Sequence, residues 1–147
     1  MNSPLDILNA YIKQHKLRRT YERERVLEYI LTIDGHFTIQ SVHEEMNKET
    51  PISRGSIYNI IELFLNAGIV VRHPFAGAEA EYETTMRAST HHHRICTSCG
   101  AIKEFSDQKF SRAIKNRTFA SFQPKFHSIY IYGLCKKCQP KIKKTKK

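Results

Sequence analysis

The apolar residues of the first half of the chain recur at the three- and four-residue spacing of helices that bury one face. This spacing predicts a first helix over residues 4–15, a second that follows Thr20 as its N-cap, and a third over residues 38–47. A fourth helix is capped by Ser53 and has the clearest pattern, with apolar residues at i, i+3, i+4, i+7 and i+8. These five positions are Ile57, Ile60, Ile61, Phe64 and Leu65.

Two short strands are predicted after the helices, over residues 69–71 and 80–84, with a turn at residues 74–77 between them. Helices followed by a β-hairpin are typical of a winged helix. In a helix-turn-helix the second helix enters the major groove of DNA, and its N-terminal residues meet the bases. The polar residues in that place are Arg54, Ser56, Tyr58 and Asn59. A helical scaffold that binds another protein is the alternative interpretation.

The composition changes after Thr85, where strand-like segments prevail. Strands are predicted over residues 91–95, 101–105 and 127–132, the last by its alternation of residue types. Asp107 can cap a helix that runs to about Phe119, with an inner face of Phe110, Ala113 and Ile114. We therefore predict an α+β fold with a winged helix-turn-helix domain over residues 1–85 and a small α/β domain over residues 86–147.

The net charge of +10 suggests a polyanionic partner, but its distribution qualifies that inference. Residues 1–85 hold nine Lys and Arg against twelve Asp and Glu, a net of −3, whereas residues 86–147 hold fifteen against two, a net of +13. A local basic cluster precedes the second helix and continues into it: Lys13, Lys16, Arg18, Arg19, Arg23 and Arg25. No apolar run approaches the roughly 20 residues that span a membrane, and no signal peptide is visible, so we expect a cytoplasmic protein without a membrane partner.

All four cysteines lie in two Cys-x-x-Cys pairs, Cys96 with Cys99 and Cys135 with Cys138. Four thiolates satisfy a tetrahedral Zn²⁺ ion and leave no open position, which favours a structural zinc that joins the ends of the second domain. A redox pair or two disulfides are the alternatives. A zinc enzyme would need an open coordination position and a general base, so we predict no catalytic residues and no small-molecule substrate.

The histidine run His91-His92-His93 is the second candidate metal site. In a strand, His91 and His93 point to one face and His92 to the other. With carboxylates available from Glu83 and Glu104, the pair could form a mixed nitrogen and oxygen site for Fe²⁺, Mn²⁺ or Zn²⁺. A solvated strand is the alternative interpretation.

Motifs along nearly the whole chain resemble the ferric uptake regulator (Fur) family of bacterial metal-dependent repressors. They are Leu17-Arg18-Arg19-Thr20, Arg25-Val26-Leu27, Ile52-Ser53, Ser56-Ile57-Tyr58, Ala67-Gly68-Ile69-Val70, His91 to Gly100, Glu104-Phe105, Tyr130-Ile131-Tyr132-Gly133 and the pair Cys135 and Cys138. The resemblance implies a homodimer that binds a double-stranded DNA operator through its winged helix, pairs through its C-terminal domain and carries a structural zinc held by four cysteines.

The resemblance also implies a regulatory metal site made of His36, Glu83, His91, His93 and Glu104. One ion with ligands from both domains would favour one relative arrangement of the domains, by its difference in affinity for the two. In the dimer that arrangement would set the spacing of the two recognition helices on the DNA. The residues expected to contact DNA are Arg18, Arg19, Tyr21, Arg54, Ser56, Tyr58 and Asn59.

Departures from the family pattern refine these expectations. Asn59 stands where many members carry Arg, which predicts a different operator contact. A further metal site of some members would fall on Thr90, His92, Ser111 and His127, which lack its acidic residues, so we interpret His127 as a strand residue. Peroxide-sensing members typically have Asp at the position of Glu104, and zinc-sensing members often use an additional cysteine. The sequence therefore favours Fe²⁺ as the signal, with peroxide or zinc sensing, or a zinc-stabilised DNA binder without a sensor, as alternatives.

Overall fold

The structure is a computed structural model that describes residues 2–75, 77, 79–124 and 126–140. The chain divides into two compact units, Met1–Arg87 and Ala88–Lys147. Each unit has its own sheet, and the two differ in how they bury apolar side chains. No helix among the described residues is long and apolar enough to cross a membrane.

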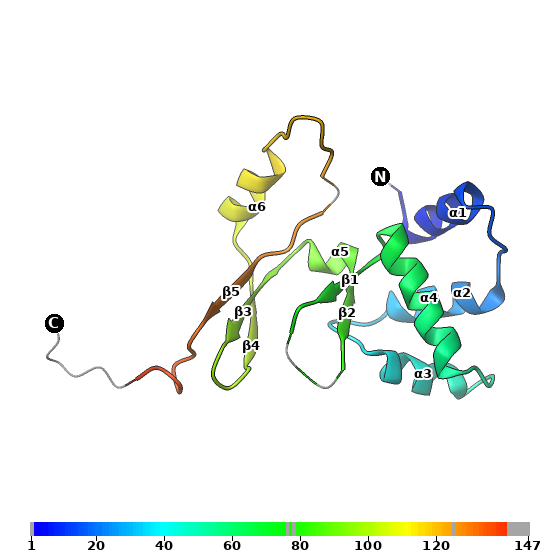
Figure 1. Cartoon of the computed structure of the whole chain (residues 1–147), viewed down its shortest axis with the longest axis horizontal. Coiled ribbons are helices and arrows are strands. Elements are labelled where there is room, and N and C mark those ends of the chain that lie inside the picture. The colour runs from blue at the N-terminus through cyan, green and yellow to red at the C-terminus, as the bar shows by residue number, and fades with distance from the viewer. Residues whose placement is uncertain (1, 76, 78, 125, 141–147) are drawn as a thin grey trace, which may run out of the picture. The chain divides into compact units, whose positions relative to one another are not determined.

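The first unit contains four helices followed by a two-stranded sheet (Figure 1). In chain order the elements are α1 (Pro4–Gln14), α2 (Tyr21–Ile30), α3 (Ile39–Asn47), α4 (Arg54–Ala67), β1 (Val70–His73) and β2 (Glu81–Thr84), followed by the short helix α5 (Thr85–Ala88). The predicted caps Thr20 and Ser53 are present, because each hydroxyl accepts a backbone N–H from the first turn that follows. Thr38, predicted as the first residue of the third helix, caps α3 in the same way. Gly68 ends α4 in the left-handed conformation at φ 82°, which glycine adopts without strain.

The hydrophobic core of this unit lies among its four helices and its hairpin. The fourth helix contributes its predicted apolar face, and Ile57, Ile61 and Phe64 have no exposed surface. The opposite face carries exposed polar residues, as the periodicity predicts. Burial of one face thus fixes which side of α4 is available to a partner.

The segment before α3 is attached to the edge of the hairpin. Phe37 and Tyr82 exchange backbone hydrogen bonds of 2.9 and 2.8 Å, which adds a bridge beside β2. The wing pairs β1 with β2 in an antiparallel register that places His73 opposite Glu81 and Val71 opposite Glu83. His36, one residue before the bridge, is therefore brought beside β2, within reach of Glu81 and Glu83.

The second unit contains a three-stranded sheet in the order β4–β3–β5 and one helix. Its elements are β3 (His92–Cys96), β4 (Ile102–Phe105), α6 (Gln108–Lys115) and β5 (Tyr130–Gly133) (Figure 1). β3 pairs with β4 in antiparallel and with β5 in parallel orientation. The parallel register sets Cys96 opposite Gly133, which brings the two Cys-x-x-Cys segments to the same end of the sheet.

Three expectations for this unit are corrected. The helix ends at Lys115 instead of about Phe119, and its predicted inner face is not buried, with Phe110 and Ile114 45% and 39% exposed. The last strand begins at Tyr130, so His127 lies outside it. The alternation of residues 127–132 predicted a longer strand than the pairing supports, because the parallel register with β3 begins only at His93 and Tyr130.

Candidate metal and DNA-binding sites

The four cysteines converge at one end of the second sheet. Each offers a sulfur, and the four sulfurs lie within 4.8 Å of one another, with Cys99 and Cys135 3.7 Å apart. The tight turn after β3 and the turn after β5 each place a pair, and Gly100 takes φ 80° where the first turn closes. Four sulfurs and no other donor type suit a tetrahedral Zn²⁺ ion with no open position.

Backbone N–H groups near the cluster favour the ionised form of one of its thiols. The N–H groups of Cys99 and Cys135 donate to the Cys96 sulfur at 3.4 Å each and lower its pKa to about 6. A hydrogen bond from Ser98 lowers the pKa of Cys138, but the neighbouring thiols Cys135 and Cys96 outweigh it and raise that pKa to about 11. One thiolate therefore forms readily, whereas ionising all four together requires the positive charge of a metal.

In the first unit, His36 and Glu83 lie side by side. His36 Nε2 is 3.5 Å from Glu83 Oε1, and the Glu83 side chain is fully buried. The pKa of His36 is raised, first by the hydrogen bond with Glu83, while burial acts in the opposite direction. A buried carboxylate beside an imidazole provides a mixed oxygen and nitrogen donor set.

Two further residues of the wing belong to this cluster, and sequence reasoning missed both. His73 Nε2 lies 2.7 Å from Glu83 Oε1, and His36 Nδ1 lies 3.0 Å from Glu81 Oε1. Donor atoms of His36, His73 and Glu83 all fall within 4.8 Å of one another. The sequence signal for Glu81 was strand alternation, because Glu81 and Glu83 are two residues apart in β2 and share a face. His73 follows only from the register of the structure, which pairs it with Glu81.

In the second unit, His91, His93 and Glu104 form a separate set of donors. Their ligand atoms lie within 4.8 Å of one another, and His91 Nε2 is 3.6 Å from Glu104 Oε2. The β3–β4 register places His93 opposite Glu104, and the rings of His91 and His93 are 5.0 Å apart. The predicted two-residue spacing therefore brings these three side chains together within this unit.

The positions that match the additional metal site of some family members also lie in the second unit, around His92. His92 Nε2 is 3.2 Å from Ser111 Oγ, and its ring lies 6.1 Å from that of His127. Burial, together with the nearby His127 and His91, lowers the pKa of His92. Thr90 instead contacts His91 and Ser106. Two imidazoles with a hydroxyl and no carboxylate ligand make a weak donor set for a hard divalent ion.

The predicted DNA-contacting residues of α4 lie on its exposed face. Arg54, Ser56, Tyr58 and Asn59 are all exposed, and Tyr58 keeps 49% of its surface accessible. In the segment that leads into α2, Arg18, Arg19 and Tyr21 are exposed as well, and Tyr21 is 69% exposed. Exposed Arg, Ser, Tyr and Asn side chains at the start of a helix are suited to phosphate and base contacts.

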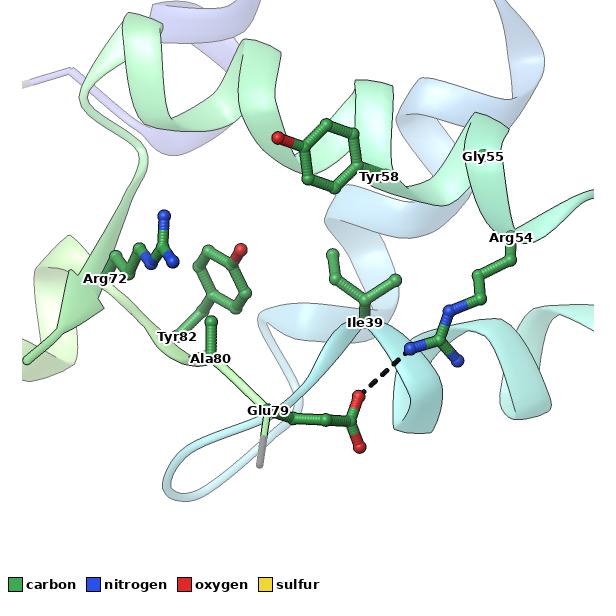
Figure 2. Close-up of a pocket in the computed structure, with 8 residues that line it drawn as sticks. All are labelled: Ile39, Arg54, Gly55, Tyr58, Arg72, Glu79, Ala80 and Tyr82. Atoms are coloured by element: carbon green, nitrogen blue, oxygen red, sulfur yellow. Dashed lines mark hydrogen bonds and ion pairs between the residues drawn. The ribbon is translucent and has the colours of Figure 1, made fainter. Parts of the chain in front are cut away.

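A cleft separates the start of α4 from the wing (Figure 2). Figure 2 shows Arg54 reaching from the helix toward Glu79 on the wing, with 3.2 Å between Arg54 Nη2 and Glu79 Oε1. Tyr58 and Arg72 line the same cleft from the helix and from β1. An arginine expected to meet DNA is therefore paired with a carboxylate of the wing.

Comparison with protein-family models gives one match, described as the ferric uptake regulator family, over residues 14–132. Among curated proteins, the chain is similar to the peroxide-responsive repressor PerR of Staphylococcus aureus, at 28% identity over 134 residues. That match covers 90% of this chain and 89% of the relative.

Solved structures of the same kind share the fold. The ferric uptake regulator of Vibrio cholerae is 29% identical with a TM-score of 0.55, over 86% of this chain and 98% of that one. The Pseudomonas aeruginosa ferric uptake regulator, solved with manganese, is 22% identical with a TM-score of 0.67, over 87% and 97% of the two chains. The Helicobacter pylori regulator covers 95% of both chains at 22% identity and a TM-score of 0.63. These likenesses agree with the predicted α+β fold, a winged helix followed by a small domain with a cluster of four cysteines.

Proposed function

The chain belongs to the ferric uptake regulator family of metal-responsive transcriptional regulators, which are not enzymes, and from this premise we propose that it is a cytoplasmic repressor that senses Fe²⁺. The metal-loaded homodimer binds a palindromic operator, and the metal-free protein releases it. The first unit reads DNA with Arg18, Arg19, Tyr21, Arg54, Ser56, Tyr58 and Asn59. The second unit pairs the protomers and holds a structural Zn²⁺ on its four cysteines.

The sensor in this proposal is one cation held by His36, Glu83, His91, His93 and Glu104. The observation that carries it is that each unit gathers its own share of nitrogen and oxygen donors, at 3.5 Å for His36 and Glu83 and 3.6 Å for His91 and Glu104. Neither share alone fills the coordination sphere of a divalent ion. A cation that needs both shares stabilises only the arrangement that provides both, and the equilibrium shifts by that difference in affinity.

The proposed homodimer explains why the second unit leaves large apolar side chains exposed. Those among its described residues are Phe110, Ile114, Phe119, Phe122, Phe126, Ile131, Tyr132 and Leu134, each 39–67% exposed. β5 lies at one edge of its sheet, where backbone groups are available to a strand of another chain. A second copy of this chain supplies both the apolar surface and the strand, as expected in a family of DNA-binding dimers.

Glu104 supports iron rather than peroxide as the signal, because the peroxide-sensing members that the family includes typically have Asp there. Peroxide sensing is the second candidate, favoured by the 28% identity to a peroxide-responsive repressor. Exposure of the Fe²⁺-loaded protein to peroxide, followed by mass spectrometry of the histidine-containing peptides, separates the two. Iron sensing predicts unmodified histidines and retained operator binding, whereas oxygen addition at a sensor histidine with loss of binding establishes the second candidate.

The sensor is tested with the double variant His93→Ala/Glu104→Ala in an operator-binding titration with and without Fe²⁺ or Mn²⁺. We expect the variant to keep its zinc and its dimeric state but to lose metal-stimulated binding. The matched control is Arg94→Gln/Lys103→Gln, the neighbouring pair in the same β3–β4 register, whose side chains leave the opposite face. Metal stimulation that persists in the first variant, or that is lost equally in the control, would refute the sensor.

A further inference from the structure

Two residues of the wing contact the proposed ligands of the first unit without belonging to the ligand set. Glu81 and His73 face each other in the β1–β2 register. Glu81 Oε1 lies 3.0 Å from His36 Nδ1, and His73 Nε2 lies 2.7 Å from Glu83 Oε1. Each proposed ligand thus has its own partner on the hairpin.

The contact between His36 and Glu81 determines which ring nitrogen can bind a metal. A carboxylate only accepts hydrogen bonds, so the proton of this contact lies on His36 Nδ1. The other nitrogen, Nε2, is the one directed at Glu83, at 3.5 Å, and it is the nitrogen that can bind a metal once its own proton is lost. Metal-binding histidines in general donate their second N–H to a carboxylate or carbonyl, which fixes the ring and increases its basicity.

The contact between His73 and Glu83 acts on the second ligand. The side chains of His73 and Glu83 are both fully buried, and Glu83 Oε1 accepts the proton of His73 Nε2. Arg87 lies on the other carboxylate oxygen, with its Nε 3.5 Å from Glu83 Oε2. A buried carboxylate with a hydrogen bond at one oxygen and an ion pair at the other keeps its orientation, so less freedom is lost when it binds an ion.

We propose that Glu81 and His73 are positioning residues of the regulatory metal site, Glu81 through His36 and His73 through Glu83. This inference rests on the proposed function, since it needs His36 and Glu83 to be ligands. The DNA-reading unit then presents its two ligands already oriented, and the hairpin of the wing sets the affinity of the sensor for its ion. A purely structural role for His73 and Glu81 would affect unfolding but not the affinity of the folded protein for metal.

The test is a titration of the full-length protein, with Zn²⁺ retained on the cysteines, by Co²⁺, whose visible absorption bands report the number and type of its ligands. The variants are His73→Leu and Glu81→Leu, which remove the contacts, and His73→Gln and Glu81→Gln, which keep a donor and an acceptor in place. His15→Gln is the control, because His15 is an exposed histidine at the C-cap of α1, outside the proposed site. Thermal unfolding of each zinc-loaded variant without Co²⁺ records any structural cost.

We expect the Leu variants to bind Co²⁺ about 10- to 100-fold more weakly, as is typical when support of a metal ligand is lost. The Gln variants should recover most of that loss and show the absorption bands of the unchanged protein, and His15→Gln should bind normally. Unchanged affinity in the Leu variants overturns the inference. So does a change of band shape in His73→Gln, because that would make His73 a ligand itself.

The same titration separates this inference from the proposed function. If His93→Ala/Glu104→Ala also binds Co²⁺ normally at the non-cysteine site, the sensor itself is refuted. If that double variant loses Co²⁺ while His73→Leu and Glu81→Leu do not, the sensor stands and only the positioning roles are wrong. If His73→Leu unfolds without Co²⁺, Glu81→Leu decides, because the Glu81 side chain is 36% exposed and its loss costs less packing, and unchanged Co²⁺ affinity in that variant overturns the inference.

Discussion

The two units of this chain bury apolar side chains to very different extents. Every residue of the hydrophobic core cluster lies between Leu8 and Tyr82, in the first unit. In the second unit the buried hydrophobic residues among those described are Ala88, Ile95 and Cys96, while eight large apolar side chains are exposed. The first unit has a core of its own, whereas the second has too little buried apolar surface to be stable without additional links.

The exposed side chains of the two units also differ, being mainly polar in the first and apolar in the second. The first unit exposes Arg and polar side chains along α4 and before α2, which suit a partner that is bound and released. The second exposes phenylalanine, isoleucine and tyrosine, which suit a permanent partner. We therefore expect the second unit to be held by zinc and by a second copy, and the first to be held by its own packing.

The largest effect is expected from removal of one zinc ligand. Cys96→Ser leaves three thiols, and structural zinc sites of this kind contribute about 10–16 kcal/mol of apparent binding energy to folding. We expect loss of zinc, of the β3–β5 pairing and of the dimer, while the helices of the first unit remain. Zinc analysis, circular dichroism and sedimentation check this, with Lys136→Ala as a control that keeps all four thiols. A stable zinc-free dimer would contradict the role assigned to the metal.

The corresponding change in the first unit is Phe64→Ala, which truncates a side chain of its hydrophobic core. Phe64 is fully buried, and truncation of a buried phenylalanine costs about 3–5 kcal/mol. We expect the helical transition in chemical denaturation to move to lower denaturant, while bound zinc is retained. Simultaneous loss of zinc at the same denaturant concentration would show that the units unfold together. It would contradict the expectation that each unit is stabilised separately.

The first unit was predictable from sequence because its elements bury a periodic face. Helix spacing and the capping residues Thr20 and Ser53 predicted the four helices and the buried face of α4. In the second unit, prediction of the inner face of α6 and of the length of β5 was wrong. Phe110 and Ile114 have the spacing of a core, but in a single chain they have no core to enter, and sequence periodicity does not identify which molecule covers a face.

The residues of the candidate sites also differ in whether the sequence predicted them. Cysteine spacing predicted a cluster that the β3–β5 register forms, and strand alternation predicted that His91 and His93 share a face, with Glu104 among the carboxylates available to them. His73 was missed because the first strand was predicted to end at residue 71, two residues before it. Glu81 lies inside the predicted second strand, but no sequence pattern connected it to His36. Their roles depend on the register of a hairpin whose turn length the sequence does not define, and a shift of one residue would turn both side chains to the other face.

A charge introduced on the apolar face of the second unit tests whether a second copy of the chain covers that face. Phe122 is 67% exposed and packs against Phe119 at 5.9 Å between ring centroids. Phe122→Asp should weaken the dimer by about 2 kcal/mol or more, as for a buried aromatic residue of an interface. Gln123→Asp adds the same charge at an exposed neighbour and should leave the dimer intact. Sedimentation over a concentration series checks both, and an unchanged dimer in Phe122→Asp would remove this residue from the interface.

The smallest effect is expected on the affinity of the first unit for DNA. Arg54 is paired with Glu79 at 3.2 Å, and both side chains remain partly exposed, so the pair contributes only about 0.2–1 kcal/mol. Arg54 must give up this partner to contact a phosphate, and the Glu79 carboxylate also repels the DNA backbone. Glu79→Gln should therefore tighten DNA binding a few-fold at low salt, and the gain should shrink as salt rises. Glu28→Gln, which neutralises an exposed carboxylate on α2, should change binding less. Weaker binding in Glu79→Gln would instead mean that Glu79 orients Arg54 for its DNA contact, and Arg54 would then be held ready rather than held back.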